Sequence, residues 1–389
     1  MTQVSAKPDA TAARPRRPRP LTDKLPDATI ISWLRDMLLI REFENRTAQA
    51  YQQAKIGGFC HLYTGQEAAC VGTIAAVNKD DPIITAYRDH GHALARGMDP
   101  KACMAEMYGK ITGCAKGKGG SMHMFDKPNW LFGGHGIVGA QTPLGAGLAF
   151  GAKYELEVLG KPLPNPGVRD GDKPKKKVSL CYLGDGALNQ GALHEAMNLA
   201  GLLGLPVIYI VENNGYSMGT SIARGTTMAD DLTKKADAYG IDGYTIDGFD
   251  VLDLYNDFKP VVDRAREQQR PAFVDLKTYR YFGHSMSDPQ KYRTKEEVEQ
   301  YKSQDSIDRL AAYLLNERKT SDGKPSLSEQ DFTAIQHEVR AIVKDAIDFA
   351  EASPEPDPDR ELYSDVLINP QPNMSPIRDY HQGAKNPLL

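Results

Sequence analysis

The stretch from Val178 to Thr220, VSLCYLGDGALNQGALHEAMNLAGLLGLPVIYIVENNGYSMGT, decides the fold of this chain. It begins with a short apolar run, 178–183, that is closed by a glycine, as is typical of a buried strand. A second run, 207–211, is rich in β-branched and aromatic residues. Because crossovers between parallel strands are right-handed, we expect the two strands to lie parallel in one sheet with a helix packed between them. That helix is predicted from Ala187 to about Leu203, with its apolar positions at Leu188, Ala192, Ala196, Leu199 and Leu203.

Polar residues follow directly after each of these two strands. Asp185 follows the first strand, and Asn213-Asn214 follow the second. Ligands of an open parallel sheet bind beyond the carboxyl ends of the strands, so we expect these side chains to converge. Their oxygens, with a main-chain carbonyl near Tyr216, form the all-oxygen set that Mg2+ prefers. Because Gly184 and Gly186 allow the backbone to approach a ligand closely, the stretch predicts a Mg2+-bridged diphosphate.

The composition excludes several functional classes. The 389 residues suffice for one large domain with extensions or for two domains, and 41% hydrophobic with 25% charged residues is ordinary for a globular protein. A formal net charge of −4 argues against nucleic-acid binding. No run of about 18 apolar residues occurs, so we expect no membrane span. The five cysteines lack C-x-x-C spacing, which argues against a disulfide framework or a zinc site and favours a reducing compartment.

Composition shifts along the chain predict four segments. Residues 1–27 are rich in Arg and Pro and are interpreted as a flexible basic tail, either disordered or in contact with an acidic partner. Residues 28–290 carry the α/β alternation. Residues 291–355 are predicted to form a helical extension, with an amphipathic helix from about Glu329 to Ala352, and residues 356–389 an irregular tail.

Further elements continue the α/β alternation. The predicted helices are 31–55, 228–239 and 251–269, the last broken near Pro260, and the predicted strands are 81–86, 244–246 and 272–279. Residues 113–139 contain eight glycines, a density that indicates close approach of the backbone to a ligand or to a neighbouring helix. The Gly/Ala-rich segment 140–152 is expected to pack closely against another helix, either within the chain or across a subunit boundary.

Three polar loops accompany these elements. His61 lies in a glycine-containing loop before a predicted helix, and a lone histidine there is either structural or in contact with a ligand. Tyr87-Arg88 follow the strand 81–86, where the arginine either clamps a diphosphate or carboxylate or forms a surface ion pair. His284 lies in a third loop, beyond the strand 272–279.

Seven motifs, taken in order and spacing, resemble the alpha subunits of the pyruvate dehydrogenase first component, within the thiamine diphosphate-dependent 2-oxo acid dehydrogenase family. The similarity extends over about residues 28–355, and HSMSDP and GFCHLY favour the pyruvate enzymes over the branched-chain 2-oxo acid and acetoin relatives. The motifs are GFCHLYTGQEA, ITAYRDHG, GCAKGKGGSMHMF, GHGIVGAQ, GDGALNQG, ENNGYSMGTS and YRYFGHSMSDP.

This resemblance implies a fold, a cofactor and a set of site residues. The implied fold is the thiamine diphosphate-binding α/β fold, a parallel sheet flanked by helices with a helical C-terminal extension. The implied activity is oxidative decarboxylation of pyruvate with transfer of the acetyl group to a lipoyl group. Mg2+ is expected on Asp185, Asn214 and the carbonyl of Tyr216, and His61 and His284 are expected at the substrate end, as catalytic groups or as phosphate anchors. Residues expected to contact thiamine diphosphate are Tyr87, Arg88, Gly136, Val138, Asp185, Gly186, Ala187, Asn214 and His284.

The resemblance also implies partners. In this family a glutamate of a separate beta subunit faces the pyrimidine ring of the cofactor, and after residue 290 this chain offers only helices and a tail. We therefore expect an α2β2 heterotetramer that is inactive without its beta subunit, and a dihydrolipoyl acetyltransferase with a lipoyl domain as the next partner. The implied location is the bacterial cytoplasm or, alternatively, the mitochondrial matrix.

The chain departs from the family pattern in two places. The insertion 159–177 lengthens a connection and is expected to be a surface loop. The loop after His284 lacks the second phosphorylatable serine of the animal pattern, whereas Ser285 and Ser221 match positions that kinases modify in animal relatives. A phosphate on Ser285 would place about two negative charges beside His284 and the cofactor diphosphate. The alternative is that Ser285 is an ordinary loop hydroxyl.

Two other functions fit parts of the pattern. One is a non-catalytic subunit that binds a Mg-diphosphate, or a hydrolase of nucleoside diphosphates, although the P-loop pattern G-x-x-x-x-G-K-[ST] is absent from the sequence. The other keeps the chemistry but changes the substrate to a branched 2-oxo acid or to acetoin.

Overall fold

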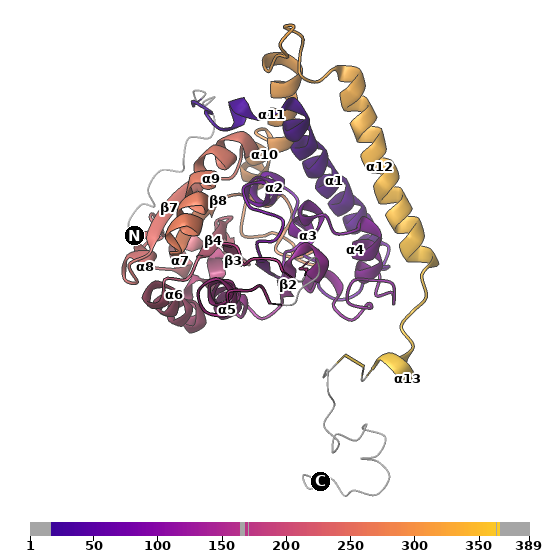
Figure 1. Cartoon of the computed structure of the whole chain (residues 1–389). Coiled ribbons are helices and arrows are strands. Elements are labelled where there is room, and N and C mark those ends of the chain that lie inside the picture. Colours follow the sequence, from indigo (N-terminus) through magenta and orange to yellow (C-terminus); the bar gives the residue numbers. More distant parts are fainter. Residues whose placement is uncertain (1–16, 164–167, 170, 363, 366–389) are drawn as a thin grey trace, which may run out of the picture.

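A six-stranded parallel sheet forms the centre of the molecule (Figure 1). The computed structural model describes residues 17–163, 168–169, 171–362 and 364–365. The strand order is β2-β1-β3-β4-β8-β7, so the chain starts near one side of the sheet and crosses to the other. The strands are β1 Ile83–Ala86, β2 Leu131–His135, β3 Ser179–Gly184, β4 Val207–Asn213, β7 Asp242–Asp247 and β8 Ala272–Lys277.

The predicted central unit is confirmed. β3 and β4 are parallel neighbours, with Ser179 opposite Val207 and Gly184 opposite Glu212. A 3-10 turn, η5 Asp185–Asn189, precedes α6 Gly191–Leu203, so the α-helix starts later than expected. The predicted apolar face of this helix is partly wrong, because Leu199 and Leu203 are about half exposed. The side chains that α6 buries are Leu193, Ala196, Met197 and Ala200.

Helices cover both faces of the sheet. The helices are α1 Asp27–Gln52, α2 Glu67–Ala75, α3 His90–Arg96, α4 Pro100–Met107, α5 Gln141–Tyr154, α6, α7 Ile222–Gly225, α8 Lys234–Asp237, α9 Val251–Gln268, α10 Lys295–Lys302, α11 Ser306–Ala312, α12 Glu329–Ala352 and α13 Pro358–Glu361. Two small strands, β5 Tyr216–Ser217 and β6 Thr220–Ser221, form an antiparallel pair after β4.

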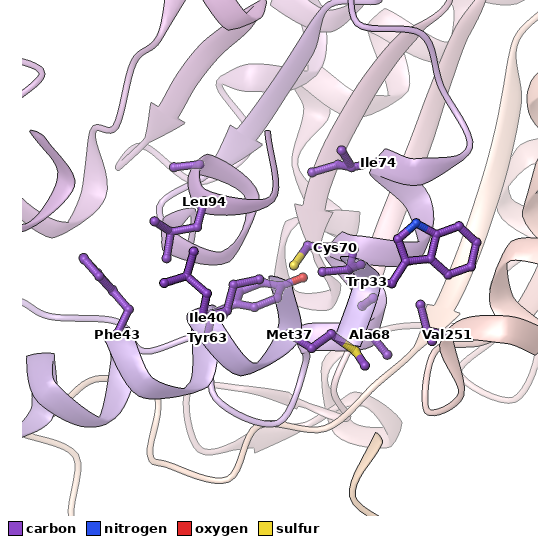
Figure 2. Close-up of a cluster of buried hydrophobic side chains, with 14 of the residues drawn as sticks. Trp33, Met37, Ile40, Phe43, Tyr63, Ala68, Cys70, Ile74, Leu94 and Val251 are labelled. Carbon is purple, nitrogen blue, oxygen red and sulfur yellow. The ribbon is translucent and has the colours of Figure 1, made fainter. Parts of the chain in front are cut away.

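Alternating side chains of the central strands β3 and β4 enter two separate hydrophobic clusters. Leu180 and Tyr182 of β3 join the cluster formed with α1, α2 and α9, whereas Cys181 and Leu183 join the cluster under α6. Burial on both faces explains why the strands read as continuous apolar runs. Figure 2 shows part of the first cluster, with the labelled side chains Trp33, Met37, Ile40, Phe43, Tyr63, Ala68, Cys70, Ile74, Leu94 and Val251.

The glycine-rich region 113–139 contains a strand that the sequence did not reveal. β2 pairs with β1, with Ala86 opposite His135, although its sequence LFGGH has two consecutive glycines. Gly133 has φ +92° and lies against the ring of Phe125, where a Cβ would collide. Pairing with a buried neighbour and close ring packing therefore outweigh the weak strand propensity of this segment.

Two helix predictions need correction. α9 is continuous through Pro260, which lies on the exposed face of the helix, whereas Phe258 and Val261 on the other face are buried and hold the helix against the body. The predicted helix 228–239 is reduced to α8, and before it the Asp231 carboxylate accepts a hydrogen bond from the main chain of Thr233 at 3.2 Å. A local turn of this kind competes with helix formation.

The ends of the described chain are tied to the body. Part of the expected tail is attached to the body, because the Arg19 guanidinium lies 2.8 Å from Asp250 and 2.7 Å from Asp253 at the start of α9. α12 has the predicted bounds and packs along α1 and α4 (Figure 1). The region expected to be an irregular tail includes the short helix α13. Residues 1–16, 363 and 366–389, and parts of the predicted insertion loop, lie outside the described residues.

α5 carries the Gly/Ala-rich segment that was predicted to pack closely. A Cβ on Gly145 would lie 2.8 Å from the Cys181 sulfur of β3, so the small residue lets this helix approach the sheet. α5 also contacts α6. In contrast, a Cβ on Gly147 or Gly151 would meet nothing within 4 Å, and these two positions face open space.

Candidate functional site

The predicted site residues other than His61 all come after the carboxyl end of a strand of the sheet. The neighbouring strands β2, β1, β3 and β4 are parallel, so their carboxyl ends lie side by side. β2 is followed by Gly136 and Val138, and β1 by Tyr87 and Arg88. The next two strands, β3 and β4, lead into the residues Asp185, Gly186, Ala187, Asn214 and Tyr216. The loop with His284 comes after β8, the next strand in the sheet. This edge is where ligands bind in open α/β sheets.

Asp185 is buried and has an unused oxygen. It is 5% exposed, and its Oδ2 atom has no hydrogen-bond partner. Burial raises the pKa of Asp185 to about 6, although backbone N–H groups of Gly186 and Gly215 donate to the carboxylate. The bond from Gly215 brings this carboxylate next to the residue that follows Asn214. A buried carboxylate with a free oxygen is suited to bind a cation.

Asn214 lies on the adjacent strand end. Its Nδ2 group donates to the side-chain oxygen of Gln66 at 3.2 Å, and its Oδ1 atom accepts a hydrogen bond from the main chain of Tyr216 at 3.3 Å. The first bond fixes the orientation of the amide, with Oδ1 as its oxygen. Gln66 was not predicted as a site residue, although it lies in one of the quoted motifs, and its own Nε2 group is buried without a partner. A buried polar group without a partner needs an explanation, and the free Nε2 group of Gln66 beside Asn214 is consistent with a position where a ligand binds.

His61, Tyr87 and His284 form a compact ring cluster. Their ring centroids are 4.7 Å apart for His61 and Tyr87, 5.1 Å for His61 and His284, and 5.6 Å for Tyr87 and His284. His61 is buried and its Nδ1 atom has no hydrogen-bond partner. The structure therefore brings the two histidines together, as their proposed shared position at the substrate end requires.

Both histidines are neutral at pH 7. Burial lowers the pKa of His61 to about 2, and the positive charge of Arg88 acts in the same direction. Burial, Arg88 and Arg280 likewise lower the pKa of His284 to about 4. We expected pKa values near 6.5, which would allow protonation near neutral pH. In this environment each ring can still donate one N–H hydrogen bond, but the cationic form is disfavoured.

Arg88 has a different set of partners from those expected. It is 7% exposed, and its guanidinium donates to the main-chain carbonyls of Leu62 at 2.6 Å and His284 at 2.7 Å. It therefore joins the loops that carry the two histidines. It is not a surface ion pair. Burial and the nearby charge of Arg280 lower the pKa of Arg88, while Glu212 and Glu44 act in the opposite direction.

Small residues allow close approach at two positions. A Cβ on Gly186 would collide with the Ser217 hydroxyl and lie 2.9 Å from the Ser217 Cβ, and a Cβ on Gly136 would lie 3.2 Å from the ring of His123. Ala187 is buried, whereas Val138 is 42% exposed. Gly186 is therefore required by its own neighbours, apart from any ligand.

The glycine density of 113–120 has a partner that the sequence did not identify. The buried carboxylate of Glu106 accepts backbone hydrogen bonds from Ala115 at 2.8 Å, Gly117 at 2.9 Å, Gly119 at 2.8 Å and Gly120 at 3.0 Å. The glycines thus approach a neighbouring helix, α4, which is one of the two options that the sequence left open. Only the folded contact itself reveals this arrangement.

A cleft of about 1270 Å3 opens at the same edge of the sheet. It is lined by Asn214 and Tyr216, and by an aromatic group that includes Tyr279 and Tyr301, whose rings stack 3.8 Å apart. His61 and His284 are not among the residues that line it. Within the described residues, no three His, Cys, Asp or Glu side chains form a metal-binding cluster. A cation at Asp185 would therefore depend on amide and carbonyl oxygens.

Comparisons with known proteins agree with this geometry. A model of the dehydrogenase E1 component family matches residues 35–359. The pyruvate dehydrogenase E1 component subunit alpha of Rickettsia prowazekii is 46% identical over 355 residues, which cover 91% of this chain and 99% of the relative. The subunit of the same name from Rhizobium meliloti is 47% identical, over 86% of this chain and 88% of the relative. The chloroplastic pyruvate dehydrogenase E1 component subunit alpha-3 of Oryza sativa is 39% identical, over 86% of this chain and 75% of the relative.

No described helix combines the length and the apolar character that a membrane crossing requires.

The sheet order and the flanking helices confirm the predicted fold class. Together with the family match, which covers most of the sequence, they lead to one conclusion: the chain belongs to the dehydrogenase E1 component family.

Proposed function

We propose that this chain is the alpha subunit of a pyruvate dehydrogenase, which decarboxylates pyruvate and passes the acetyl group to the lipoyl group of an acyltransferase. The family depends on thiamine diphosphate. Several relatives carry the name pyruvate dehydrogenase E1 component subunit alpha. The single observation that carries the proposal is the unused, buried oxygen of Asp185 beside the Asn214 strand end, in a site that also holds two neutral histidines.

The residues of the site fit a Mg2+-bound diphosphate. Asp185 would supply its unpaired oxygen, and the Asn214 amide oxygen and the Tyr216 carbonyl would supply neutral oxygens, a donor set that suits Mg2+. Gly186 keeps the backbone accessible beside them. We propose that the remaining contacts to the cofactor come from Tyr87, Arg88, Gly136, Val138, Ala187 and His284.

When bound, thiamine diphosphate supplies the electron sink for the loss of CO2. His61 and His284, as neutral imidazoles, donate hydrogen bonds to the carboxylate and ketone oxygens of pyruvate and orient them. Arg88 and Arg280 provide positive charge near these oxygens. Burial of the rings keeps water away from the developing negative charge, where hydrogen bonds are stronger than in bulk solvent.

We propose a beta subunit as the obligatory partner. The resemblance assigns the glutamate that faces the cofactor pyrimidine to that partner. Large apolar side chains are exposed on α5 and α6, which supports a protein partner over this face. These side chains are Leu144, Phe150, Tyr154, Leu199, Leu202 and Leu203. We further propose a dihydrolipoyl acetyltransferase as the next partner and a cytoplasmic location in a bacterium.

The test is CO2 release from carboxyl-labelled pyruvate. With thiamine diphosphate, Mg2+ and a lipoyl domain as the acceptor of the acetyl group and electrons, the purified chain is expected to release none, and addition of the beta subunit is expected to start turnover. In the assembled enzyme, His61→Gln and His284→Gln are each expected to lower kcat by roughly 100-fold or more, since hydrogen-bond donation to developing charge contributes about this much. His337→Gln, on the exposed side of α12, is the matched control and should leave kcat unchanged.

Sustained turnover by the chain alone would refute the dependence on a beta subunit. A reconstituted enzyme that acts on 2-oxoisovalerate much faster than on pyruvate would refute the substrate assignment.

A further inference from the structure

Ser121 occupies a junction beneath the histidine cluster. It is 4% exposed, and its Oγ atom accepts a hydrogen bond from the main-chain N–H of His61 at 3.1 Å. The same oxygen lies 2.9 Å from the Nε2 atom of His90, and the main-chain oxygen of Ser121 lies 3.0 Å from that atom. One serine therefore joins the His61 loop to the segment that carries Tyr87 and Arg88.

His90 is held on its other side by a buried acid. Its Nδ1 atom lies 3.0 Å from both oxygens of Glu44, and neither residue has any exposed surface. A carboxylate and a main-chain carbonyl both accept hydrogen bonds, so His90 donates from both ring nitrogens and pairs with Glu44 as a cation. Glu44 also accepts the main-chain N–H of Tyr63 at 2.7 Å. The pair thus fixes the His61 loop at a second point.

Glu106 organises the loop that leads into Ser121. Its four backbone hydrogen bonds organise residues 115–120, and Ser121 follows directly. Side chains on Gly113, Gly117 or Gly119 would collide with Glu106, with the backbone at Gly109 or with the backbone at His123. The loop is therefore built to bring the Ser121 hydroxyl to one place.

The Nδ1 atom of His61 has no hydrogen-bond partner, and the ring packs against Phe59, Tyr87 and His284. The hydrogen bond from its main-chain N–H to Ser121 fixes the point from which the ring enters this cluster. From this geometry we infer that Ser121 is a positioning residue for His61, anchored by Glu106 through the glycine loop and by the Glu44–His90 pair. The expected effect of Ser121 on turnover rests on the proposed function. The hydrogen bonds that anchor the loop do not depend on it.

The first experiment uses the assembled enzyme with its beta subunit. Ser121→Ala removes the shared hydroxyl and is expected to lower kcat by roughly ten- to hundredfold, since small misplacements of a reacting group have effects of this size. The half-saturating Mg2+ concentration should change less than about twofold, because the proposed metal-binding residues Asp185, Asn214 and Tyr216 are on other loops. Ser179→Ala is the matched control, since that hydroxyl is buried on β3 without a partner, and its kcat should equal that of the wild type.

A second variant tests the anchor. Glu106→Gln turns an acceptor oxygen into a donor and opposes two of the four loop amides. If Glu106 acts through Ser121, the double variant S121A/E106Q should lose no more kcat than the worse single variant. Multiplicative losses would overturn the link between the two residues, and a kcat for S121A within about twofold of the wild type would overturn the positioning role.

Hydrogen exchange of the wild-type enzyme tests the anchoring without any variant. The amides of Ala115, Gly117, Gly119, Gly120 and His61 lie outside the α-helices and strands, yet they are expected to exchange at least roughly 100-fold more slowly than exposed loop amides. Rapid exchange across 113–121 would overturn the inference even if the enzyme is active. If the enzyme fails to decarboxylate pyruvate but these amides are protected, the proposed function fails and the anchoring stands.

Discussion

Replacing Asp185 with asparagine should stabilise the cofactor-free chain. Burial raises the pKa of Asp185 from 3.8 to about 6, so the ionised form is disfavoured in the fold. One pKa unit corresponds to about 1.36 kcal/mol. The raised pKa therefore means that the ionised carboxylate lowers the free energy of unfolding by roughly 3 kcal/mol above pH 7. Because Asp185 is 5% exposed, solvent screening removes little of this penalty. The asparagine side chain would keep an acceptor oxygen for the amides of Gly186 and Gly215 without the buried charge.

The pH dependence has a definite sign. A carboxyl with a raised pKa in the fold weakens the native state above the folded pKa, and the penalty disappears below the unfolded pKa. The increase in the free energy of unfolding caused by Asp185→Asn should therefore be complete above about pH 6 and absent below pH 3.8. With an unfolding entropy of about 2.1 cal/mol/K per residue, roughly 3 kcal/mol corresponds to about 4 °C in Tm for a chain of this size.

The assay is thermal unfolding of the purified chain between pH 4 and 8, with and without Mg2+ and thiamine diphosphate. The wild type should gain stability from the ligands, as any protein that binds ligand only when folded does. The Asp185→Asn variant should have a higher Tm than the wild type without ligands, and the ligands should not raise its Tm. The exposed Asp348→Asn on α12 is the matched control and should change stability by less than about 0.5 kcal/mol. A D185N variant that is less stable at pH 7, or that still responds fully to the ligands, would refute this reasoning.

Three further predictions concern the same edge of the sheet. Gly186→Ala should lower the free energy of unfolding by roughly 1–3 kcal/mol through overlap with Ser217, measured by urea unfolding, and G186A/S217G should recover most of the loss; an equal loss in both variants would exclude that contact. By NMR, the imidazoles of His61 and His284 should remain neutral from pH 8 down to about pH 5, and a midpoint near 6.5 for either would show that burial does not depress its pKa. Asn214→Leu should raise the Mg2+ concentration needed for half-saturation at least roughly tenfold in calorimetry with thiamine diphosphate, whereas an unchanged value would remove Asn214 from the metal site.

Local patterns predicted the regular parts of the fold well. α12 has the predicted bounds because its ends carry clear signals, with Ser328 as N-cap and Ser353-Pro354 as the stop. β3 and β4 were recognisable because strands buried on both faces are continuously apolar. β2 was missed because its glycines lack strand propensity, and it forms only because β1 offers a buried partner. The buried face of α6 was misassigned because Leu199 and Leu203 are apolar but exposed.

The site was predictable to the extent that its residues follow strand ends. Strand order then brought Asp185, Asn214 and Tyr87 to one edge, as a parallel sheet requires. The supporting contacts could not be predicted, because Glu106 and Ser121 act through partners that only the fold brings near. The same limit applies to protonation: the low pKa values of His61 and His284 result from burial and from Arg88, which no sequence pattern records.

The central claim is that Asp185 and Asn214 together hold a divalent cation that binds the diphosphate. The most direct measurement is a crystal structure of the assembled enzyme with thiamine diphosphate and Mn2+ in place of Mg2+, with the metal located by its anomalous scattering. We predict one Mn2+ at about 2.1–2.2 Å from the Asp185 carboxylate, the Asn214 amide oxygen and the Tyr216 carbonyl, with diphosphate oxygens completing the octahedron. A metal bound to the diphosphate but out of reach of these three residues would contradict the account.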